Sequence, residues 1–211
     1  MQSPPDYYNF ERAELFPFID LNMEKVLDVG CAKGTFGANL KAKGVKEVWG
    51  IEPEKKIAEE ARLKLDHVFT GMIEEFSTSH NQTFDAIFFN DVLEHMYDPE
   101  SALNTAKKHL NDNGKIYASI PNFIHVNNLY EILSTRDIEY QDSGILDRTH
   151  VRFFTKKSIR RLFEKTGYKV ESIDGINPNY GQVFRYINFL LLKRFDEMKF
   201  IQFYVRAKHL H

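Results

Sequence analysis

The amino-acid sequence predicts an α/β fold, in which an open, mostly parallel and doubly wound sheet carries helices on both faces. Short branched apolar runs alternate with helical segments along most of the chain. A glycine-rich turn directly follows the first of these runs, as in folds that bind ligands at a sheet edge. The chain has 211 residues and a hydrophobic fraction of 43%, which suits one globular domain with a full core.

The predicted strands are recognised by their apolar composition. KVLDV is a short branched run, as is typical of a strand buried in a parallel sheet, and FDAIFFN is strongly apolar throughout. Asn113 and Gly114 form a turn before another such run. The predicted strands are 25–29, 46–52, 67–71, 84–90, 115–121, 168–174 and 199–207.

Helix signals separate these strands. Gly44 fits a C-cap after the first helix, and Pro53 suits the first turn of the next. Asp98 and Pro99 begin a further helix, and Gly167 ends another. The predicted helices are the stretch that ends at Gly44, then 53–64, 98–111, 123–135, 156–167 and 181–195, with a long connection at 136–155.

Charge is unevenly distributed along the chain. The net charge of -2 argues against a general nucleic-acid binder. Residues 1–135 hold 13 Lys and Arg against 21 Asp and Glu, a net of -8, whereas residues 136–211 hold 15 against 9, a net of +6. The basic part is interpreted either as a solvated face or as a rim for an anionic substrate.

Other features exclude several classes of protein. The single cysteine, Cys31, excludes an intrachain disulfide. MQSPPDYYNF lacks the apolar core of a signal peptide, and the apolar run at 187–192 is too short to span a membrane. These features favour a cytoplasmic protein. No metal site is expected, because the histidines form no i, i+4 pair and Cys31 has no cysteine partner.

The glycine-rich turn indicates a ligand site. VLDVGCAKGTFG places Asp28 at the end of a strand, with Gly30 and Gly34 in the turn that follows. The spacing differs from the dinucleotide-binding pattern G-x-G-x-x-G. Glu52 ends the next strand, where a carboxylate can accept two hydrogen bonds from a ribose diol.

Four segments in order, from about residue 8 to 175, resemble the class I S-adenosylmethionine-dependent methyltransferases. Among them are VLDVGCAKG, WGIEP and FDAIFFNDVLEHMYDPESALNTAKKHLNDNGKIYASIPN. The resemblance implies a seven-stranded Rossmann-like fold, S-adenosylmethionine as cofactor and S-adenosylhomocysteine as product. It also assigns site residues: Asp28, Gly30, Cys31 and Gly34 to the methionine end, Glu52 to the ribose, Met72 and Ile73 to the adenine, and Asn90 to the methionine side.

The chain departs from this family in two places. Ala32 stands where a glycine is common, which we expect to be harmless. Met72 stands where an aspartate often bonds the adenine amino group, so backbone, water or Glu74 must meet that group. Cys31 needs no chemical role and is also explained by packing alone.

Methyl transfer to a hydroxyl requires a group that removes the hydroxyl proton, and histidine suits this role near neutral pH. His95 follows the strand at 84–90 and is the first candidate; the alternative is a structural histidine that caps the following helix. Glu94 is expected to orient a neighbour or to bind backbone, and Asp91 to do likewise.

The stretch at 138–170 resembles methyltransferases found alongside glycosyltransferases in surface-polysaccharide pathways. Its segment GILDRTHVRFFT, residues 144–155, mixes charges with large apolar residues. We expect it to form the substrate wall of the site, with Asp147 paired to Arg148 or Arg152; the alternative is a structural hydrogen-bond network. His150 is the second catalytic candidate, and the predicted substrate-binding residues are Tyr140, Arg148, His150 and Arg152.

Together these features predict a single methyltransferase domain over 1–211, with 122–155 and 178–197 as substrate-side or cap insertions. The expected acceptor is a hydroxyl of a sugar, a nucleotide-linked sugar or a glycan. The alternatives are O-methylation of a phenol or quinone precursor, and an inactive cofactor-binding module. The helix at 181–195 is expected to pack on the sheet, to cap the substrate or to join a homodimer, so a monomer or homodimer is expected.

Overall fold

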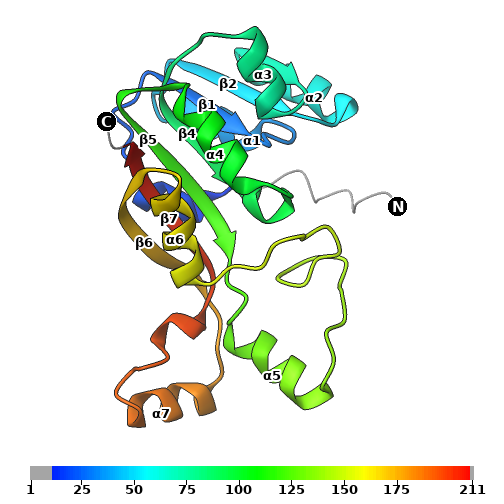
Figure 1. The fold of residues 1–211 in the computed structure, drawn as a ribbon, viewed down its shortest axis with the longest axis vertical. Helices are drawn as coiled ribbons and strands as arrows, with labels where there is room; N and C mark the ends of the chain where they lie inside the picture. The colour runs from blue at the N-terminus through cyan, green and yellow to red at the C-terminus, as the bar shows by residue number, and fades with distance from the viewer. Residues whose placement is uncertain (1–10, 210–211) are drawn as a thin grey trace.

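A seven-stranded sheet forms the body of the protein in the computed structural model, which describes residues 11–209 (Figure 1). The strand order is β3-β2-β1-β4-β5-β7-β6, and β7 runs antiparallel to both of its neighbours. The doubly wound, mostly parallel, seven-stranded sheet predicted from the sequence is therefore confirmed. The segment MQSPPDYYNF, in which no signal peptide was expected, lies outside the described residues. The strands are β1 (Lys25–Val29), β2 (Glu47–Glu52), β3 (His67–Thr70), β4 (Phe84–Asn90), β5 (Leu110–Pro121), β6 (Tyr168–Pro178) and β7 (Phe200–His209).

Two apolar cores lie on opposite faces of the sheet, because successive side chains of a strand point to opposite sides. In β1, Val26 belongs to one core and Leu27 to the other. The first core is covered by η1 (Ala13–Phe18), α1 (Thr35–Ala42) and α2 (Lys55–Ala61), and the second by α3 (Ile73–Ser79), α4 (Pro99–Lys107) and α6 (Lys156–Lys165).

Among the helix boundaries that differ from the prediction, two show how tertiary contacts or a different cap override local signals. The helix expected to run to 111 ends at Lys107, since Leu110 already pairs with Phe84 in the sheet and Asn111 Nδ2 donates to Asp85 Oδ1 at 2.7 Å. The helix expected at 53–64 begins at Lys55, because the Glu54 side chain caps it by accepting the Lys56 N–H.

Sequence patterns also missed one helix and overextended another. Helix α3 directly follows β3, and Glu75 Oε2 accepts the N–H of its N-cap residue Met72 at 2.7 Å. The helix expected at 181–195 is α7 (Gln182–Leu190). It stops there because Leu192 and Lys193 adopt φ values of 53° and 59°, in the left-handed region.

Helices α5 (Val126–Thr135) and α7 project from one end of the sheet, away from both cores (Figure 1). The buried residue of α5 is Asn128 and that of α7 is Asn188, whereas large apolar side chains of α7 are exposed. The short helices η2 (Leu93–His95) and η3 (Asp196–Lys199) complete the described elements. Over residues 11–209, every helix is too short or too polar to cross a membrane.

Candidate active site

The glycine turn after β1 requires glycine at two positions. Gly30 has φ +70°, and a Cβ there would lie 2.6 Å from Cγ2 of Val92. Gly34 has φ +73° and lies close to the backbone of Ala61, at 3.2 Å from a Cβ built on it. The turn is tied to β2 because the N–H groups of Gly30 and Cys31 both donate to the Ile51 carbonyl, at 2.8 and 3.0 Å.

Glu52 closes this turn from the end of β2. Its Oε2 accepts the Ala32 N–H and its Oε1 accepts the Glu54 N–H, both at 3.0 Å. Burial raises the pKa of this carboxyl, and the two backbone donors oppose that shift. Each oxygen still has a lone pair available, so the Glu52 side chain fits the two hydroxyls of a ribose.

Two further polar groups at strand ends face the same pocket. Asp28 is 3% exposed, and burial together with the neighbouring Glu52 raises the pKa of its carboxyl to about 8, although Arg12 opposes the shift. Both amide atoms of Asn90 are buried and have no hydrogen-bond partner among residues 11–209. Unpartnered buried amides call for a ligand, so these residues fit the methionine end of S-adenosylmethionine.

Three other predicted ligand residues line the same pocket. The Cys31 thiol packs over β2, since a Cβ on Gly50 would lie 2.6 Å from its sulfur, and burial raises the pKa of this thiol. Met72 is 44% exposed and Ile73 is buried, and together they form the apolar part of the lining expected around an adenine. Glu74, suggested for the adenine amino group, lies outside the lining residues.

The pocket has a volume of about 590 Å³ and extends from the glycine turn to the segment around residue 145. This volume is typical of small-molecule sites. Its lining includes the turn residue Gly30 and Glu52 as well as His95 and His150. The pocket therefore joins the predicted cofactor residues to both predicted catalytic histidines.

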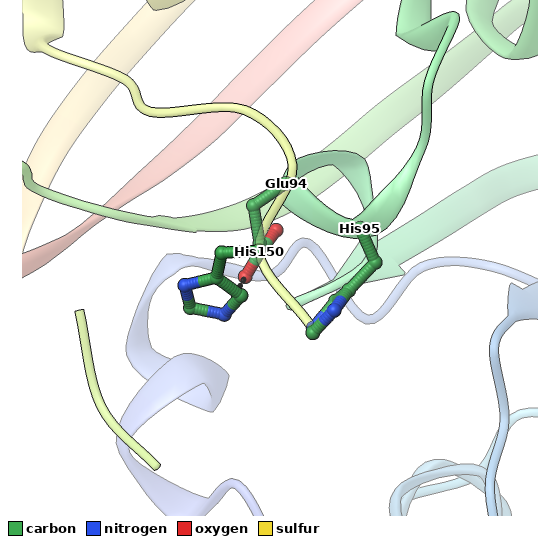
Figure 2. Close-up of side chains that lie close together, drawn as sticks. All are labelled: Glu94, His95 and His150. Carbon is green, nitrogen blue, oxygen red and sulfur yellow. Dashed lines mark ion pairs between the residues drawn. The ribbon is translucent and has the colours of Figure 1, made fainter. Parts of the chain in front are cut away.

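Glu94, His95 and His150 form a cluster in this pocket, called the acceptor cluster below (Figure 2). The two imidazole rings meet edge to face with centroids 4.7 Å apart. His95 Nδ1 lies 3.2 Å from the Thr149 carbonyl and His150 Nδ1 lies 2.9 Å from the Ile145 carbonyl. Each Nδ1 must therefore carry the proton that it donates, which leaves Nε2 with a lone pair. Burial and the neighbouring His150 lower the pKa of His95, which keeps its ring neutral at pH 7.

His95 is not a helix cap, which was the alternative to its catalytic role. Helix α4 is capped by Asp98, whose Oδ1 accepts the Ser101 N–H at 2.9 Å. The position of His95 is set instead by η2, which follows β4 at the edge of the pocket. This part of the sequence analysis is corrected because the aspartate three residues on already serves the helix end.

The Glu94 carboxylate is buried without a hydrogen-bond partner among the described residues, which the sequence did not indicate. Glu94 is 1% exposed, and neither of its side-chain oxygens has a hydrogen-bond partner within residues 11–209. Of the two roles expected for Glu94, backbone binding is made by its main-chain carbonyl, which accepts the Val151 and Arg152 N–H groups, and orienting a neighbour stays a prediction for its side chain. Burial raises the pKa of the Glu94 carboxyl to about 8. Its Oε1 lies 4.0 Å from His150 Nε2.

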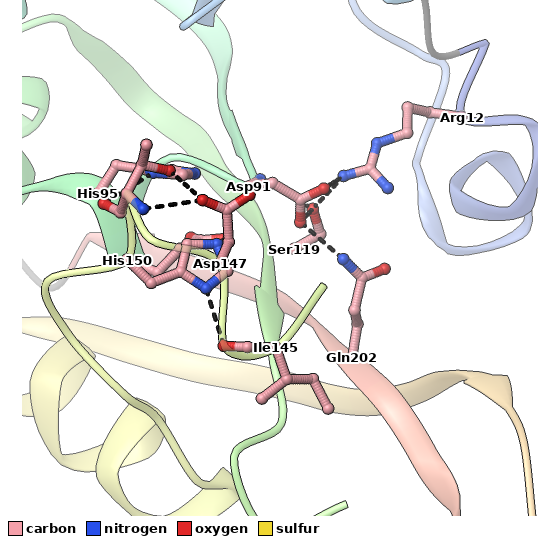
Figure 3. A network of polar contacts seen from close by, with 10 residues as sticks. Arg12, Asp91, His95, Ser119, Ile145, Asp147, His150 and Gln202 are labelled. Atoms are coloured by element: carbon pink, nitrogen blue, oxygen red, sulfur yellow. Dashed lines mark hydrogen bonds and ion pairs between the residues drawn. The ribbon is translucent and has the colours of Figure 1, made fainter. Parts of the chain in front are cut away.

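The segment 144–155 is held by local hydrogen bonds (Figure 3). Asp147 Oδ1 accepts the N–H and the hydroxyl of Thr149, at 2.8 and 2.6 Å. The expected pairing of Asp147 with Arg148 or Arg152 is therefore wrong. Arg148 pairs with Asp142 at 3.1 Å, and Arg152 donates to the Tyr97 carbonyl at 2.6 Å.

The four predicted substrate-binding residues thus separate into two groups. His150 lines the pocket, whereas Tyr140, Arg148 and Arg152 lie outside its lining. Tyr140 stacks near Phe153, with ring centroids 6.4 Å apart. The segment contributes other groups to the lining instead, namely Gly144, Ile145, Asp147 and Thr149, and Ser143 precedes it in the lining.

Sequence patterns missed a polar network that includes lining residues of the pocket (Figure 3). Arg12 forms an ion pair with Asp91 and donates to Ser119 Oγ at 3.1 Å. Asp91 Oδ1 also accepts from Ser119 Oγ and from Gln202 Nε2, both at 2.8 Å. These four residues come from four separate segments, so spacing along the chain carries no signal of their proximity.

Comparisons with known proteins agree with this geometry. A family model described as a methyltransferase domain matches residues 6–173. A ubiquinone biosynthesis O-methyltransferase of Vibrio atlanticus is 26% identical over 164 residues, which are 74% of this chain and 68% of that protein. A tRNA U34 carboxymethyltransferase of Campylobacter hominis is 32% identical over 108 residues, which are 49% of this chain and 38% of that protein.

Solved structures share the fold. A S-adenosylmethionine-dependent methyltransferase of Archaeoglobus fulgidus superimposes with a TM-score of 0.72 at 18% identity, over 93% of this chain and 91% of that one. The plantazolicin methyltransferase BamL, in complex with a desmethylplantazolicin analogue and S-adenosylhomocysteine, gives a TM-score of 0.61 at 17% identity. That match covers 88% of this chain and 76% of BamL.

Proposed function

The chain belongs to the class I S-adenosylmethionine-dependent methyltransferases, and we propose that within this family it O-methylates a hydroxyl of a sugar, a nucleotide-linked sugar or a glycan. S-adenosylmethionine, its cofactor, supplies an electrophilic methyl group on a positively charged sulfur. The protein residues must orient the acceptor and accept the proton of its hydroxyl.

The acceptor cluster is the observation that carries this proposal. Its imidazole and carboxylate groups lie in the same pocket as the cofactor residues Asp28, Glu52 and Asn90. The Nε2 lone pair of His95 is suited to accept the hydroxyl proton, because its lowered pKa leaves the ring neutral. His150 is suited to assist from the other side of Glu94, with its Nε2 4.0 Å from that carboxylate.

Polar lining residues other than those assigned to the cofactor support a polyhydroxylated acceptor. Thr149 and Gln202 supply groups that hydrogen-bond hydroxyls, and Asp147 is already held in place. The resemblance of 138–170 to polysaccharide-pathway methyltransferases supports the same class. The segments 122–155 and 178–197 are proposed as the substrate side, with Tyr140, Arg148 and Arg152 meeting parts of a large acceptor outside the pocket.

A second candidate is O-methylation of a phenol or quinone precursor. The similarity to a ubiquinone biosynthesis O-methyltransferase over 68% of that relative favours it. The apolar lining residues Met96, Ile145 and Ile201 suit an aromatic ring. The tRNA-modifying relative supports neither candidate, since its match covers 38% of that protein.

A competition between acceptor classes tests the proposal. Purified protein is incubated with methyl-deuterated S-adenosylmethionine and a mixture of nucleotide sugars, free glycans and catechols, and products are detected by mass spectrometry. We expect the deuterated methyl group on a sugar oxygen. Labelling of catechols alone contradicts the sugar assignment, and cofactor binding without turnover on any acceptor supports an inactive binding module.

The association state and location are proposed from the same features. The exposed apolar side chains on α7, among them Phe189 and Leu190, suit either a homodimer contact or a cap over the substrate. Light scattering over a range of concentrations separates the two, because a monomer at every concentration removes the dimer. The proposed location is the cytoplasm, and cell fractionation tests it.

A further inference from the structure

The acceptor cluster brings together three potential metal ligands from two distant segments of the chain. One ligand atom from each of Glu94, His95 and His150 lies within 4.8 Å of the other two. Glu94 and His150 are buried and His95 is partly buried. Figure 2 shows the Glu94 carboxylate between the two imidazoles, with one of its oxygens directed at His150.

The cluster contains electron-pair donors and lacks a matching hydrogen-bond donor. Both Nδ1 positions are used by main-chain carbonyls, so each ring offers a lone pair at Nε2. Both carboxylate oxygens of Glu94 are buried and have no partner among the described residues. A protonated Glu94 does not resolve this, because 4.0 Å between its Oε1 and His150 Nε2 is too long for a hydrogen bond.

The surroundings of the two histidines match those of metal ligands. A metal-binding imidazole usually donates its second N–H to a carbonyl or carboxylate, which orients the ring and fixes its tautomer. His150 does so to Ile145 and His95 does so to Thr149. Asp147 stabilises the turn that presents these carbonyls, by accepting two hydrogen bonds from Thr149. Asp147 is therefore a positioning residue.

We propose that Glu94, His95 and His150 bind one divalent transition-metal cation and that this ion binds the acceptor oxygen. Two imidazoles and one carboxylate suit Zn²⁺, Fe²⁺, Co²⁺ or Mn²⁺, whereas Mg²⁺ prefers oxygen ligands. Zinc bonds of about 2.0–2.2 Å place ligand atoms roughly 3–3.5 Å apart, so the side chains close by about 1 Å around the ion.

The second part of this inference rests on the proposed O-methylation. Three protein ligands leave a coordination position open toward the pocket, where a hydroxyl can bind and lose its proton more easily. The acceptor O–H bond breaks with its proton passing to solvent. The new oxygen–methyl bond forms as the methyl–sulfur bond breaks, and the electron pair stays on sulfur in S-adenosylhomocysteine. With the ion bound, His95 and His150 act as ligands, and the ion replaces them in activating the hydroxyl.

No metal site was expected from the sequence, because its histidines form no i, i+4 pair. His95 and His150 instead lie in η2 and in the long connection before α6. They meet because Glu94 accepts main-chain hydrogen bonds from Val151 and Arg152, which holds the connection against η2.

Metal titration of the chelator-treated full-length protein tests the site directly. Zn²⁺, Mn²⁺ and Mg²⁺ are each titrated alone by calorimetry, and bound metal is counted by mass spectrometry after desalting. We expect one Zn²⁺ per chain and no comparable binding of Mg²⁺. Glu94→Gln and His150→Asn should weaken Zn²⁺ binding by about a hundredfold or more, since losing even an outer-shell partner costs 10–100-fold.

Matched controls replace the same residue types elsewhere. Glu100→Gln, which removes a surface ion pair with Lys165, and His67→Asn, at an exposed position, should bind Zn²⁺ as the wild type does. If Glu94→Gln fails to fold, Co²⁺ in the wild-type protein is the second measurement. Visible d–d absorption that Zn²⁺ abolishes supports the site. Less than about a fifth of an ion per chain, or wild-type affinity in a folded Glu94→Gln variant, overturns it.

Activity assays separate this inference from the proposed function. Sugar methylation that stops in chelator and returns with Zn²⁺ or Mn²⁺ supports a catalytic ion. Full sugar methylation in chelator overturns the role of the ion in the reaction. If ion binding is observed but no sugar is methylated, the proposed acceptor is wrong and the metal site stands.

Discussion

Two carboxylates of the pocket differ in how far the protein itself satisfies them: Glu52, among the cofactor residues (the cofactor side), and Glu94, in the acceptor cluster (the acceptor side). On the cofactor side, the Glu52 oxygens already accept two backbone N–H groups, and the glycine turn is tied to β2. On the acceptor side, the Glu94 side-chain oxygens have no hydrogen-bond partner within residues 11–209. Glu52 is thus preorganised by backbone donors, whereas Glu94 needs a ligand to satisfy its buried oxygens, as the Asn90 amide does among the cofactor residues.

The largest expected effect that separates the two sides is on turnover. His95→Ala removes a group that accepts a proton or binds an ion, so turnover should fall by about 10²–10⁴. Affinity for S-adenosylhomocysteine should stay within about twofold, because Glu52 and the glycine turn, rather than His95, are the residues assigned to the cofactor. Steady-state kinetics on the identified acceptor measure turnover, and calorimetry measures the affinity for S-adenosylhomocysteine. His67→Ala serves as the control in both. Wild-type turnover in the variant would show that His95 is structural.

A smaller effect is expected on the cofactor side. Glu52→Ala should weaken S-adenosylmethionine binding by about tenfold to a hundredfold, since hydrogen bonds to a charged group contribute roughly 1.5–3 kcal/mol. Glu52→Gln keeps the shape and should lose less. Calorimetry on both variants measures the change. Unchanged affinity in Glu52→Ala would remove the ribose assignment, provided that the melting temperature shows the turn to be intact.

Burial of Asp28 predicts a pH dependence of stability in the ligand-free protein. Its pKa is about 8 in the folded protein, against the ordinary value of 3.8 for an aspartate in the unfolded chain. Between these values the unfolded chain loses its proton while the folded protein keeps it, so stability falls as pH rises from about 4 to 8. One pKa unit corresponds to about 1.4 kcal/mol.

Asp28→Asn should remove part of this fall, about 1–2 kcal/mol between pH 5 and 7. Urea unfolding at pH 5, 6 and 7 measures the slope, and Asp137→Asn at an exposed position serves as control. Equal slopes in wild type and Asp28→Asn would mean that Asp28 titrates normally.

The smallest effect concerns the glycine turn itself. Ala32 has φ 47°, in the left-handed region that costs a residue with a Cβ about 1–2 kcal/mol. The cost of this backbone conformation could not be read from the sequence, and the expectation that alanine is harmless for the site stays a prediction. Ala32→Gly should stabilise the protein by about 0.5–1 kcal/mol after the larger entropy of the unfolded glycine chain is subtracted. Ala38→Gly, inside α1, should instead destabilise it by about 1 kcal/mol. Thermal unfolding of both variants decides the sign.

Local sequence predicted the cofactor side because its signals lie within single segments. KVLDV predicted β1, and the positions of Asp28, Glu52 and Asn90 at strand ends placed them at one sheet edge. Boundaries were less predictable, because the end of α4 depends on the pairing of Leu110 with Phe84. Such a contact between distant residues has no periodic signature in the chain.

The acceptor side was predicted in part. His95 and His150 were both candidates, and both line the pocket. The predicted partner of Asp147 was wrong, because an ion pair with an arginine was expected. Asp147 instead follows a short-range rule, by which an aspartate accepts a hydrogen bond from the backbone N–H two residues on. Arg12 was missed because its contacts with Asp91 and Ser119 join segments far apart in sequence.

The most direct test of the central claim is a comparison of S-adenosylhomocysteine affinity in Glu52→Ala and His95→Ala by calorimetry. If the two sides of the pocket are separate, Glu52→Ala weakens binding by about tenfold to a hundredfold, while His95→Ala binds as tightly as the wild-type protein. Equal weakening in both variants, or weakening in His95→Ala alone, would contradict the division of the pocket into a cofactor side and an acceptor side.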